Sequence, residues 1–136
     1  MGTEKIKIDK KIYYLEDDET FQTIMTGFLE KNYPDYYVKT FDTVRVGKSY
    51  MEANGFPTIV ITDYKMPAGE EDGEVLIRWM ENKGFNNYIA WTGNPIELKK
   101  NLPEIDFNCI EKNDYEKLFL LMNKMLALPN IKWIEF

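Results

Sequence analysis

Residues 58–67 read Thr58-Ile-Val-Ile-Thr-Asp63-Tyr-Lys65-Met-Pro67, and this stretch decides the fold. Its apolar residues form a short run bounded by turn signals, which is typical of a strand buried on both faces of a parallel sheet. Asp63 stands where that strand ends. Ligands of open parallel sheets bind outside the carboxyl ends of the strands, so Asp63 is a candidate reacting group. On this stretch alone, a turn start or a helix cap explains the carboxylate equally well.

Strand-like and helix-like stretches alternate on both sides of this segment. The strand-like stretches are short and apolar or β-branched, and the helix-like stretches have apolar residues at helical spacing or a capping residue before the first turn. The alternation predicts a doubly wound α/β fold, a five-stranded parallel sheet with helices on both faces. We predict strands at 11–15, 36–41, 58–62, 88–92 and 107–110, and helices after Asp18, over 43–54, after Gly73, after Asn94 and after Asp114.

Three of the predicted helices have a clear apolar face that we expect to pack against the sheet. In chain order, these faces are Phe21, Ile24, Met25, Phe28 and Leu29; then Val75, Leu76, Trp79 and Met80; and last Leu118, Leu121, Met122, Met125 and Leu126.

Length and composition favour one folded domain in a reducing compartment. The chain has 136 residues, of which 44% are hydrophobic and 15% aromatic, and this excludes a disordered chain. No apolar run approaches the length that crosses a bilayer, and residues 1–10 lack the apolar centre of a signal peptide. The single cysteine, Cys109, fits the cytoplasm. We expect a charged extension at 1–10, one domain at 11–128 and an apolar tail at 129–136 that packs on the domain's own surface.

The charged residues exclude several classes of function. The formal net charge is −6, and the 17 lysines and arginines are scattered along the chain. Direct binding to nucleic acid is therefore not expected, because a phosphate backbone requires clustered cations. The chain has no histidine, which excludes histidine-based acid–base catalysis, nearly all zinc sites with imidazole ligands, and a phosphohistidine on this chain. A phosphoryl group would have to come from another molecule.

Polar residues stand at the carboxyl ends of four predicted strands, which share one edge of a parallel sheet. Glu16 and Asp17 follow the first strand, Asp63 the third, Thr92 ends the fourth and Lys112 follows the fifth. Three carboxylates without thiolate or imidazole form an oxygen-rich site that favours Mg²⁺, and a divalent cation would offset their mutual repulsion. Lys112 adds a positive charge, and Thr92 adds a hydroxyl donor.

Such a set suits phosphoryl transfer onto an aspartate, with Asp63 as the nucleophile. That reaction requires a well-placed nucleophile and groups that neutralise the phosphoryl oxygens. Each residue also has an ordinary explanation by itself: a solvated helix start for Glu16 and Asp17, a turn residue for Thr92, or a surface lysine for Lys112. These explanations do not account for their joint placement at the ends of four strands.

With these residues in place, the chain resembles the response-regulator receiver domains of two-component signalling, from about residue 11 to about residue 126. The resemblance rests on segments 12–19, 59–67, 89–93 and 109–112. It implies a flavodoxin-like sheet with the strand order 2-1-3-4-5. It also implies that Asp63 accepts a phosphoryl group in trans, from a histidine kinase or a phosphotransfer protein.

The resemblance further implies roles for the other residues of the site. Mg²⁺ would be held directly by Asp17, Asp63 and the backbone carbonyl of Lys65, with Glu16 assisting through water. Thr92 and Lys112 would contact the phosphoryl oxygens. The chain would act as a regulatory phosphoacceptor and not as an enzyme. Its output would be a contact with a downstream protein target, without a membrane and with a homodimer left open.

The chain departs from the usual receiver pattern at several points. Cys109 stands where many receivers carry the switch aromatic, and Asn113 replaces the proline that usually follows the lysine. The loop between Pro67 and Gly73 is longer than the common pattern, and the predicted helix between Pro95 and Pro103 is short. These departures leave the phosphorylation chemistry intact and leave the route of the output open.

Two other interpretations share features with this one. A pseudo-receiver, which is a protein-interaction module that works without phosphorylation, would lack at least one of the site residues, and none is missing. A phosphatase of the haloacid-dehalogenase type would place its nucleophile after the first strand in an Asp-x-Asp pattern. Here that segment reads Glu16-Asp-Asp-Glu19, so this alternative ranks last.

Overall fold

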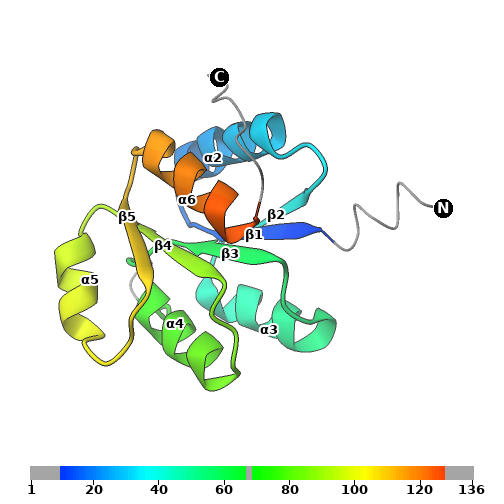
Figure 1. Ribbon diagram of the computed structural model, residues 1–136. Coiled ribbons are helices and arrows are strands. Elements are labelled where there is room, and N and C mark those ends of the chain that lie inside the picture. Colours follow the sequence, from blue (N-terminus) through cyan, green and yellow to red (C-terminus); the bar gives the residue numbers. More distant parts are fainter. Residues whose placement is uncertain (1–9, 67–68, 128–136) are drawn as a thin grey trace.

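The strand that ends at Asp63 lies at the centre of a parallel sheet in the computed structural model, which describes residues 10–66 and 69–127. Strand β3 (Ile59–Thr62) pairs with β1 (Lys11–Leu15) on one side and with β4 (Tyr88–Thr92) on the other. The edge strands are β2 (Tyr37–Phe41) and β5 (Asn108–Glu111). The sheet therefore has the order β2-β1-β3-β4-β5 (Figure 1), and the predicted fold class and strand order are confirmed.

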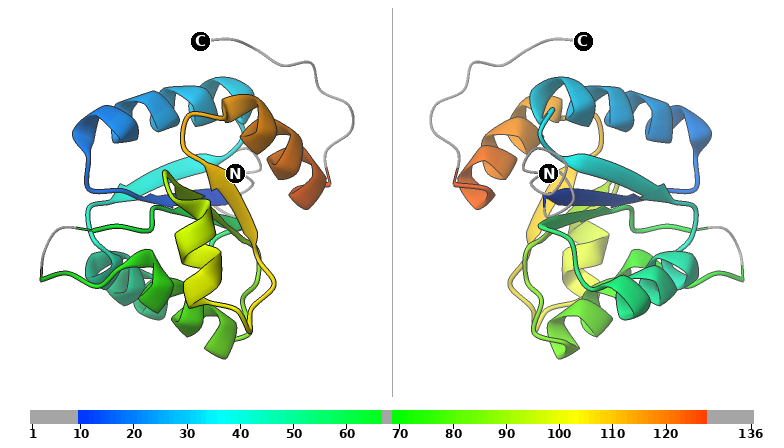
Figure 2. Two further views of the ribbon diagram at one scale, coloured as in Figure 1. Left: turned by 90° about the vertical axis from the view of Figure 1, so that its left-hand side faces the viewer. Right: turned by 90° about the vertical axis from the view of Figure 1, so that its right-hand side faces the viewer.

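Helices cover both faces of the sheet, because each parallel connection must cross over one face. Two helices, α2 (Glu19–Asn32) and α6 (Tyr115–Met125), lie on one face. The other face carries α3 (Val44–Asn54), α4 (Gly73–Asn82) and α5 (Pro95–Asn101). Both side views in Figure 2 show this three-layer arrangement.

Alternation along the strands divides the buried side chains between two cores. In β1, Tyr13 and Leu15 pack toward α3, α4 and α5, whereas Ile12 and Tyr14 pack toward α2 and α6. All four residues of β3 are buried, as the apolar run in the sequence predicts for a central strand.

Side-chain caps begin three of the helices at the predicted positions. The side chains of Asp18, Asn94 and Asp114 accept hydrogen bonds from the backbone N–H groups three residues later, at 3.0–3.2 Å. These bonds satisfy N–H groups that have no partner inside a helix. The helix starts are therefore set by local sequence.

The predicted apolar face of α4 is partly wrong. Val75 is exposed, and Ile77 is buried in its place beside Leu76 and Met80. The backbone of Asp63 lies against Gly73, so the Gly73 side of the helix faces inward. Ile77 lies four residues after Gly73, on the same side of the helix, and therefore also faces inward. In α2, the predicted core residue Ile24 is likewise exposed.

The predicted ends of the chain lie largely outside the described residues. Only Lys10 of the extension at 1–10 is described, and the tail at 129–136 is not. The described elements run from β1 to α6. Among the described helices, none has both the length and the apolar character that a membrane span requires.

Candidate functional site

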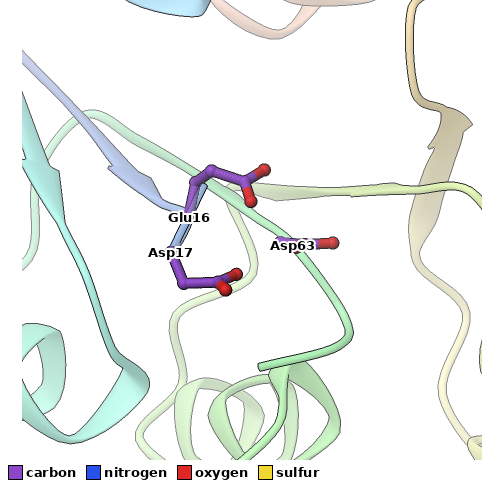
Figure 3. Close-up of side chains that lie close together, drawn as sticks. All are labelled: Glu16, Asp17 and Asp63. Atoms are coloured by element: carbon purple, nitrogen blue, oxygen red, sulfur yellow. The ribbon is translucent and has the colours of Figure 1, made fainter. Parts of the chain in front are cut away.

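Three carboxylates meet at the carboxyl ends of β1 and β3 (Figure 3). Glu16, Asp17 and Asp63 each offer an oxygen, and these oxygens lie within 4.8 Å of one another. Sheet pairing continues past the strands, because the Asp63 backbone N–H donates to the Leu15 carbonyl at 3.0 Å. Glu16 is 1% exposed and Asp63 6%, whereas Asp17 is open to solvent. The register of two neighbouring strands thus brings together carboxylates that are far apart in the sequence.

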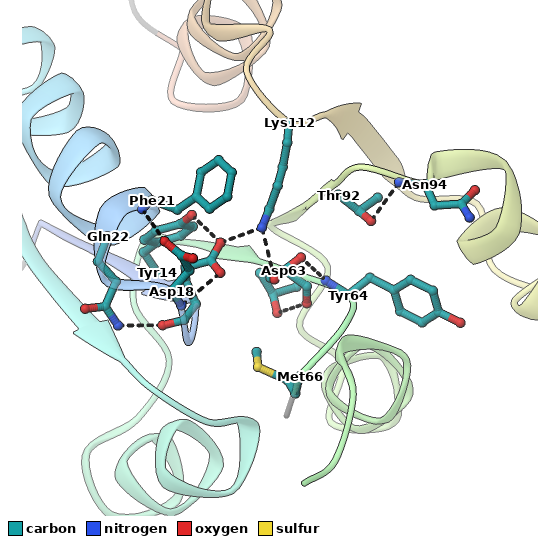
Figure 4. A network of polar contacts seen from close by, with 12 residues as sticks. Tyr14, Asp18, Phe21, Gln22, Asp63, Tyr64, Met66, Thr92, Asn94 and Lys112 are labelled. Atoms are coloured by element: carbon teal, nitrogen blue, oxygen red, sulfur yellow. Dashed lines mark hydrogen bonds and ion pairs between the residues drawn. The ribbon is translucent and has the colours of Figure 1, made fainter. Parts of the chain in front are cut away.

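Lys112 enters the same cluster from the end of β5. Its backbone N–H donates to the Thr92 carbonyl at 3.0 Å, which fixes the side chain's point of origin. The Nζ atom lies 2.8 Å from Glu16 Oε1 and 3.1 Å from Asp63 Oδ2. It also lies 4.1 Å from the centre of the Phe21 ring in α2. The Lys112 ammonium therefore bridges two buried carboxylates. Figure 4 shows its contact with Asp63.

The Glu16 carboxylate is held on both of its oxygens. Oε1 accepts a hydrogen bond from the Tyr14 hydroxyl at 2.8 Å, in addition to its contact with Lys112. Oε2 accepts one from the Asp18 backbone N–H at 3.2 Å. Burial and the neighbouring Glu16 charge raise the pKa of Tyr14, so the phenol remains a donor.

Thr92 lies at the end of β4 beside the cluster, with 2% of its surface exposed. Its hydroxyl oxygen accepts a hydrogen bond from the Asn94 backbone N–H at 3.1 Å, so the oxygen faces the start of α5 (Figure 4). Asp63 Oδ1 instead accepts a hydrogen bond from the Tyr64 backbone N–H at 2.7 Å. Thr92 therefore lies beside the carboxylates, as predicted, but its hydroxyl oxygen contacts Asn94 and not the carboxylates.

The side chain of Lys65 extends away from the carboxylates toward α5. Its Nζ lies 3.9 Å from Glu97 Oε1 and 4.6 Å from the centre of the Tyr64 ring. The ammonium is therefore used outside the cluster. The predicted metal-ligand role of Lys65 concerns its backbone carbonyl and stays a prediction.

The electrostatics of the cluster favour an added cation. Burial and the Glu16 charge raise the pKa of Asp63 to about 7, although Lys112 and the Tyr64 N–H act in the opposite direction. Burial alone would lower the pKa of Lys112, but its contacts with Glu16 and Asp63 outweigh that effect and raise it. One ammonium thus faces three carboxylates, and their oxygens fit a hard divalent cation such as Mg²⁺.

Two of the residues around the site were missed by sequence reasoning. Tyr14 stands two residues before Glu16, so both side chains lie on the same face of β1; this spacing is the signal that could have found it. Phe21 was predicted only as a core residue, and it also lies against Lys112. No local pattern indicates that second contact, because it joins α2 to the end of β5.

The backbone after Lys112 also differs from the usual pattern. Asn113 has a φ of 80°, in the left-handed region that asparagine tolerates. Proline, whose ring fixes φ near about −65°, cannot adopt it. The backbone at Asn113, between β5 and α6, is therefore one that proline could not adopt.

Comparison with solved structures identifies this fold in receiver domains. One is the receiver domain of a DNA-binding response regulator from Colwellia psychrerythraea 34H, with a TM-score of 0.71 and 21% identity over 88% of this chain and 99% of that one. Another is the CheY-like receiver from Methanospirillum hungatei JF-1, with a TM-score of 0.69 and 23% identity over 87% and 94%.

The response regulator TrrA from Thermotoga maritima, solved in complex with Mg²⁺-BeF, also matches with a TM-score of 0.71. Its identity is 17%, over 85% of this chain and 98% of that one. No protein-family model matches the chain, and no curated protein matches it by sequence. The likeness is therefore one of fold.

Proposed function

We propose that this chain is a phosphoacceptor receiver domain of two-component signalling. A phosphohistidine on a histidine kinase or phosphotransfer protein would donate its phosphoryl group to Asp63. The observation that carries the proposal is the placement of Lys112, whose Nζ lies within 3.1 Å of Asp63 Oδ2 in a cluster of three carboxylates. The shared fold with receiver domains supports it.

In the proposed reaction, an oxygen of the Asp63 carboxylate attacks phosphorus. A P–O bond forms, the P–N bond of the donor breaks, and its electron pair returns to the imidazole nitrogen. Lys112 stabilises the negative phosphoryl oxygens from a position that the buried cluster already fixes. Thr92 would release Asn94 and donate its hydroxyl to a phosphoryl oxygen.

Mg²⁺ fits this proposal through the residues already described. Asp17, Asp63 and the Lys65 carbonyl would hold it, with Glu16 nearby. Bound there, the cation supplies positive charge that offsets the charge of the phosphoryl oxygens. Asp17 is the open member of the carboxylate cluster, so a hydrated cation can reach it from solvent.

The proposed output is a change of protein contacts. The phosphoryl group would remain on Asp63 and bias a surface between two states, so the chain is a regulator and not a turnover enzyme. Its partners would be the phosphodonor and a downstream protein target in the cytoplasm, and the domain would span residues 11–128.

Phosphorylation of Asp63 is tested by incubating the protein with Mg²⁺ and acetyl phosphate and measuring its intact mass. We expect the wild type to gain the mass of one phosphoryl group, and Asp63→Asn to gain none. Asp18→Asn is the matched control, because asparagine caps a helix as well as aspartate does. An unmodified wild type, or equal labelling of Asp63→Asn, would favour the pseudo-receiver instead.

A further inference from the structure

We propose that Tyr14 is a positioning residue for phosphoryl transfer, acting through Glu16 to hold Lys112 in place. This inference rests on the proposed function and adds to it a residue inside the sheet. It follows from a chain of three contacts that runs from a buried phenol to the phosphoacceptor: Tyr14 to Glu16, Glu16 to Lys112, and Lys112 to Asp63.

The first contact sets the direction of the Glu16 side chain. Tyr14 is fully buried among the residues that pack against α2 and α6. A buried hydroxyl requires a partner, and this one donates to Glu16 Oε1 at 2.8 Å. Tyr14 lies in β1 and Glu16 directly follows its last residue, so the two side chains, two residues apart in extended chain, can meet on one face.

The second contact makes Glu16 a support for the lysine. The same oxygen, Oε1, meets Tyr14 and Lys112 at 2.8 Å each, while the Asp18 N–H occupies Oε2. Donors on both oxygens fix the carboxylate in one orientation, facing the lysine. Glu16 is thus committed to Lys112 and the Asp18 N–H, whereas Asp17, the exposed member of the cluster, is the carboxylate that a cation can reach from solvent.

The third contact places the lysine for the reaction. Lys112 has few alternative positions, since the Phe21 ring faces its Nζ at 4.1 Å and only 14% of its side chain is exposed. If the Glu16 side chain turned away, the ammonium would lose one of its two anionic contacts and keep only its contact with Asp63. Tyr14 touches no reacting atom, so its effect on phosphoryl binding passes entirely through this pair.

The test compares Tyr14→Phe with the wild type in two titrations. Binding of Mg²⁺ alone is measured by calorimetry, and binding of beryllofluoride, a phosphoryl mimic, is followed at saturating Mg²⁺ by tryptophan fluorescence. For Tyr14→Phe we expect beryllofluoride affinity to fall about tenfold, the typical effect of losing a hydrogen bond to a charged group. We expect Mg²⁺ affinity to stay within about twofold, since the direct ligands are unchanged.

Tyr88→Phe is the matched control. Tyr88 is also a buried strand tyrosine, and its hydroxyl donates to Glu81 Oε2 at 2.7 Å. The substitution Tyr88→Phe removes the same kind of hydrogen bond, from a buried tyrosine to a glutamate, and leaves the contacts of Glu16 unchanged. We expect it to bind both ligands as the wild type does, so an equal loss of beryllofluoride affinity in Tyr88→Phe would overturn the proposal.

A double-mutant cycle with Glu16→Gln tests the route. If Tyr14 acts through Glu16, Tyr14→Phe adds little further loss in a Glu16→Gln background, and additive losses would contradict the proposal. The cycle also separates the two hypotheses. If the wild type binds no beryllofluoride, the proposed function is overturned. If the wild type and Tyr14→Phe bind beryllofluoride with equal affinity, only the role of Tyr14 is overturned.

Discussion

Asp63 and Asp17 show how one residue type acquires two environments. Asp63 is 6% exposed, and burial together with Glu16 raises its pKa to about 7. Asp17 lies in the same cluster but is open to solvent. In the proposed function, the buried carboxylate would accept the phosphoryl group beside Lys112. The open one would meet a hydrated cation.

The raised pKa of Asp63 predicts a pH-dependent stability. Between about pH 4 and pH 7 the folded chain keeps a proton on Asp63 that the unfolded chain has already lost. The free energy of unfolding of the wild type should therefore fall relative to Asp63→Asn as pH rises through this window. The relative loss is on the order of 4 kcal/mol, because the pKa lies about three units above its ordinary value and one unit corresponds to about 1.4 kcal/mol.

Urea unfolding in EDTA at several pH values measures this difference. Above about pH 7 both states have lost the proton, so the difference should level off. Parallel stability curves for the wild type and Asp63→Asn would contradict the raised pKa.

Among the elements, α4 packs against the backbone of Asp63 through a glycine. A Cβ at Gly73 would lie 2.2 Å from the Asp63 carbonyl oxygen and 3.0 Å from the Tyr64 Cα. The Gly73 N–H also donates to the Tyr64 carbonyl at 2.8 Å. The first turn of α4 therefore packs directly on the chain that follows β3.

Gly73→Ala should destabilise the fold by about 1–3 kcal/mol, because backbone atoms must move to admit the methyl group. Gly27→Ala provides the contrast, since a Cβ at this position in α2 meets nothing within 4 Å. It should stabilise the chain by about 0.5–1 kcal/mol through helix propensity. Thermal unfolding of the two variants checks the opposite signs, and stabilisation by Gly73→Ala would show that the close approach is absent.

At the scale of the whole molecule, the strand order places the site. Because β1 and β3 are neighbours in the middle of the sheet, their carboxyl ends bring Glu16, Asp17 and Asp63 together. β5 lies two strands from β3, and a long side chain from Lys112 covers that distance. A cation held by these residues would join the ends of β1 and β3 in the folded state alone.

Mg²⁺ should therefore raise the melting temperature of the whole domain. At a concentration about 100 times the dissociation constant, the added stability is about 2.7 kcal/mol. Wild type and Asp18→Asn should both gain, whereas Asp17→Asn should lose most of the gain, because Asp17 belongs to the carboxylate cluster and Asp18 does not. Equal gains in the two variants would place the cation elsewhere.

Cys109, one of the departures from the usual receiver pattern, has an unreactive thiol in this fold. It is half-buried on β5 and packs against the core that faces α3, α4 and α5. Burial raises the pKa of its thiol to about 11, against the opposing charge of Lys99. The residue at the usual place of the switch aromatic is thus a small protonated side chain within the fold.

Local sequence patterns were enough to predict the helices, the strands and the residues at their ends. Strand alternation, helical spacing and capping residues are local patterns, and they predicted the sheet, the caps at Asp18, Asn94 and Asp114, and the carboxylates beside one another. The rotation of α4 was not predictable from its own residues, because packing of Gly73 on Asp63 fixes it.

Only the tertiary structure decided which atoms meet. Lys112 could have pointed to solvent, yet it bridges Glu16 and Asp63, which lie far from it in the chain. The Tyr14 hydroxyl reaches Glu16, and the Thr92 hydroxyl turns to Asn94. These contacts depend on burial, because buried polar groups require hydrogen-bond partners. They also depend on strand register, which determines the groups that lie within hydrogen-bonding distance.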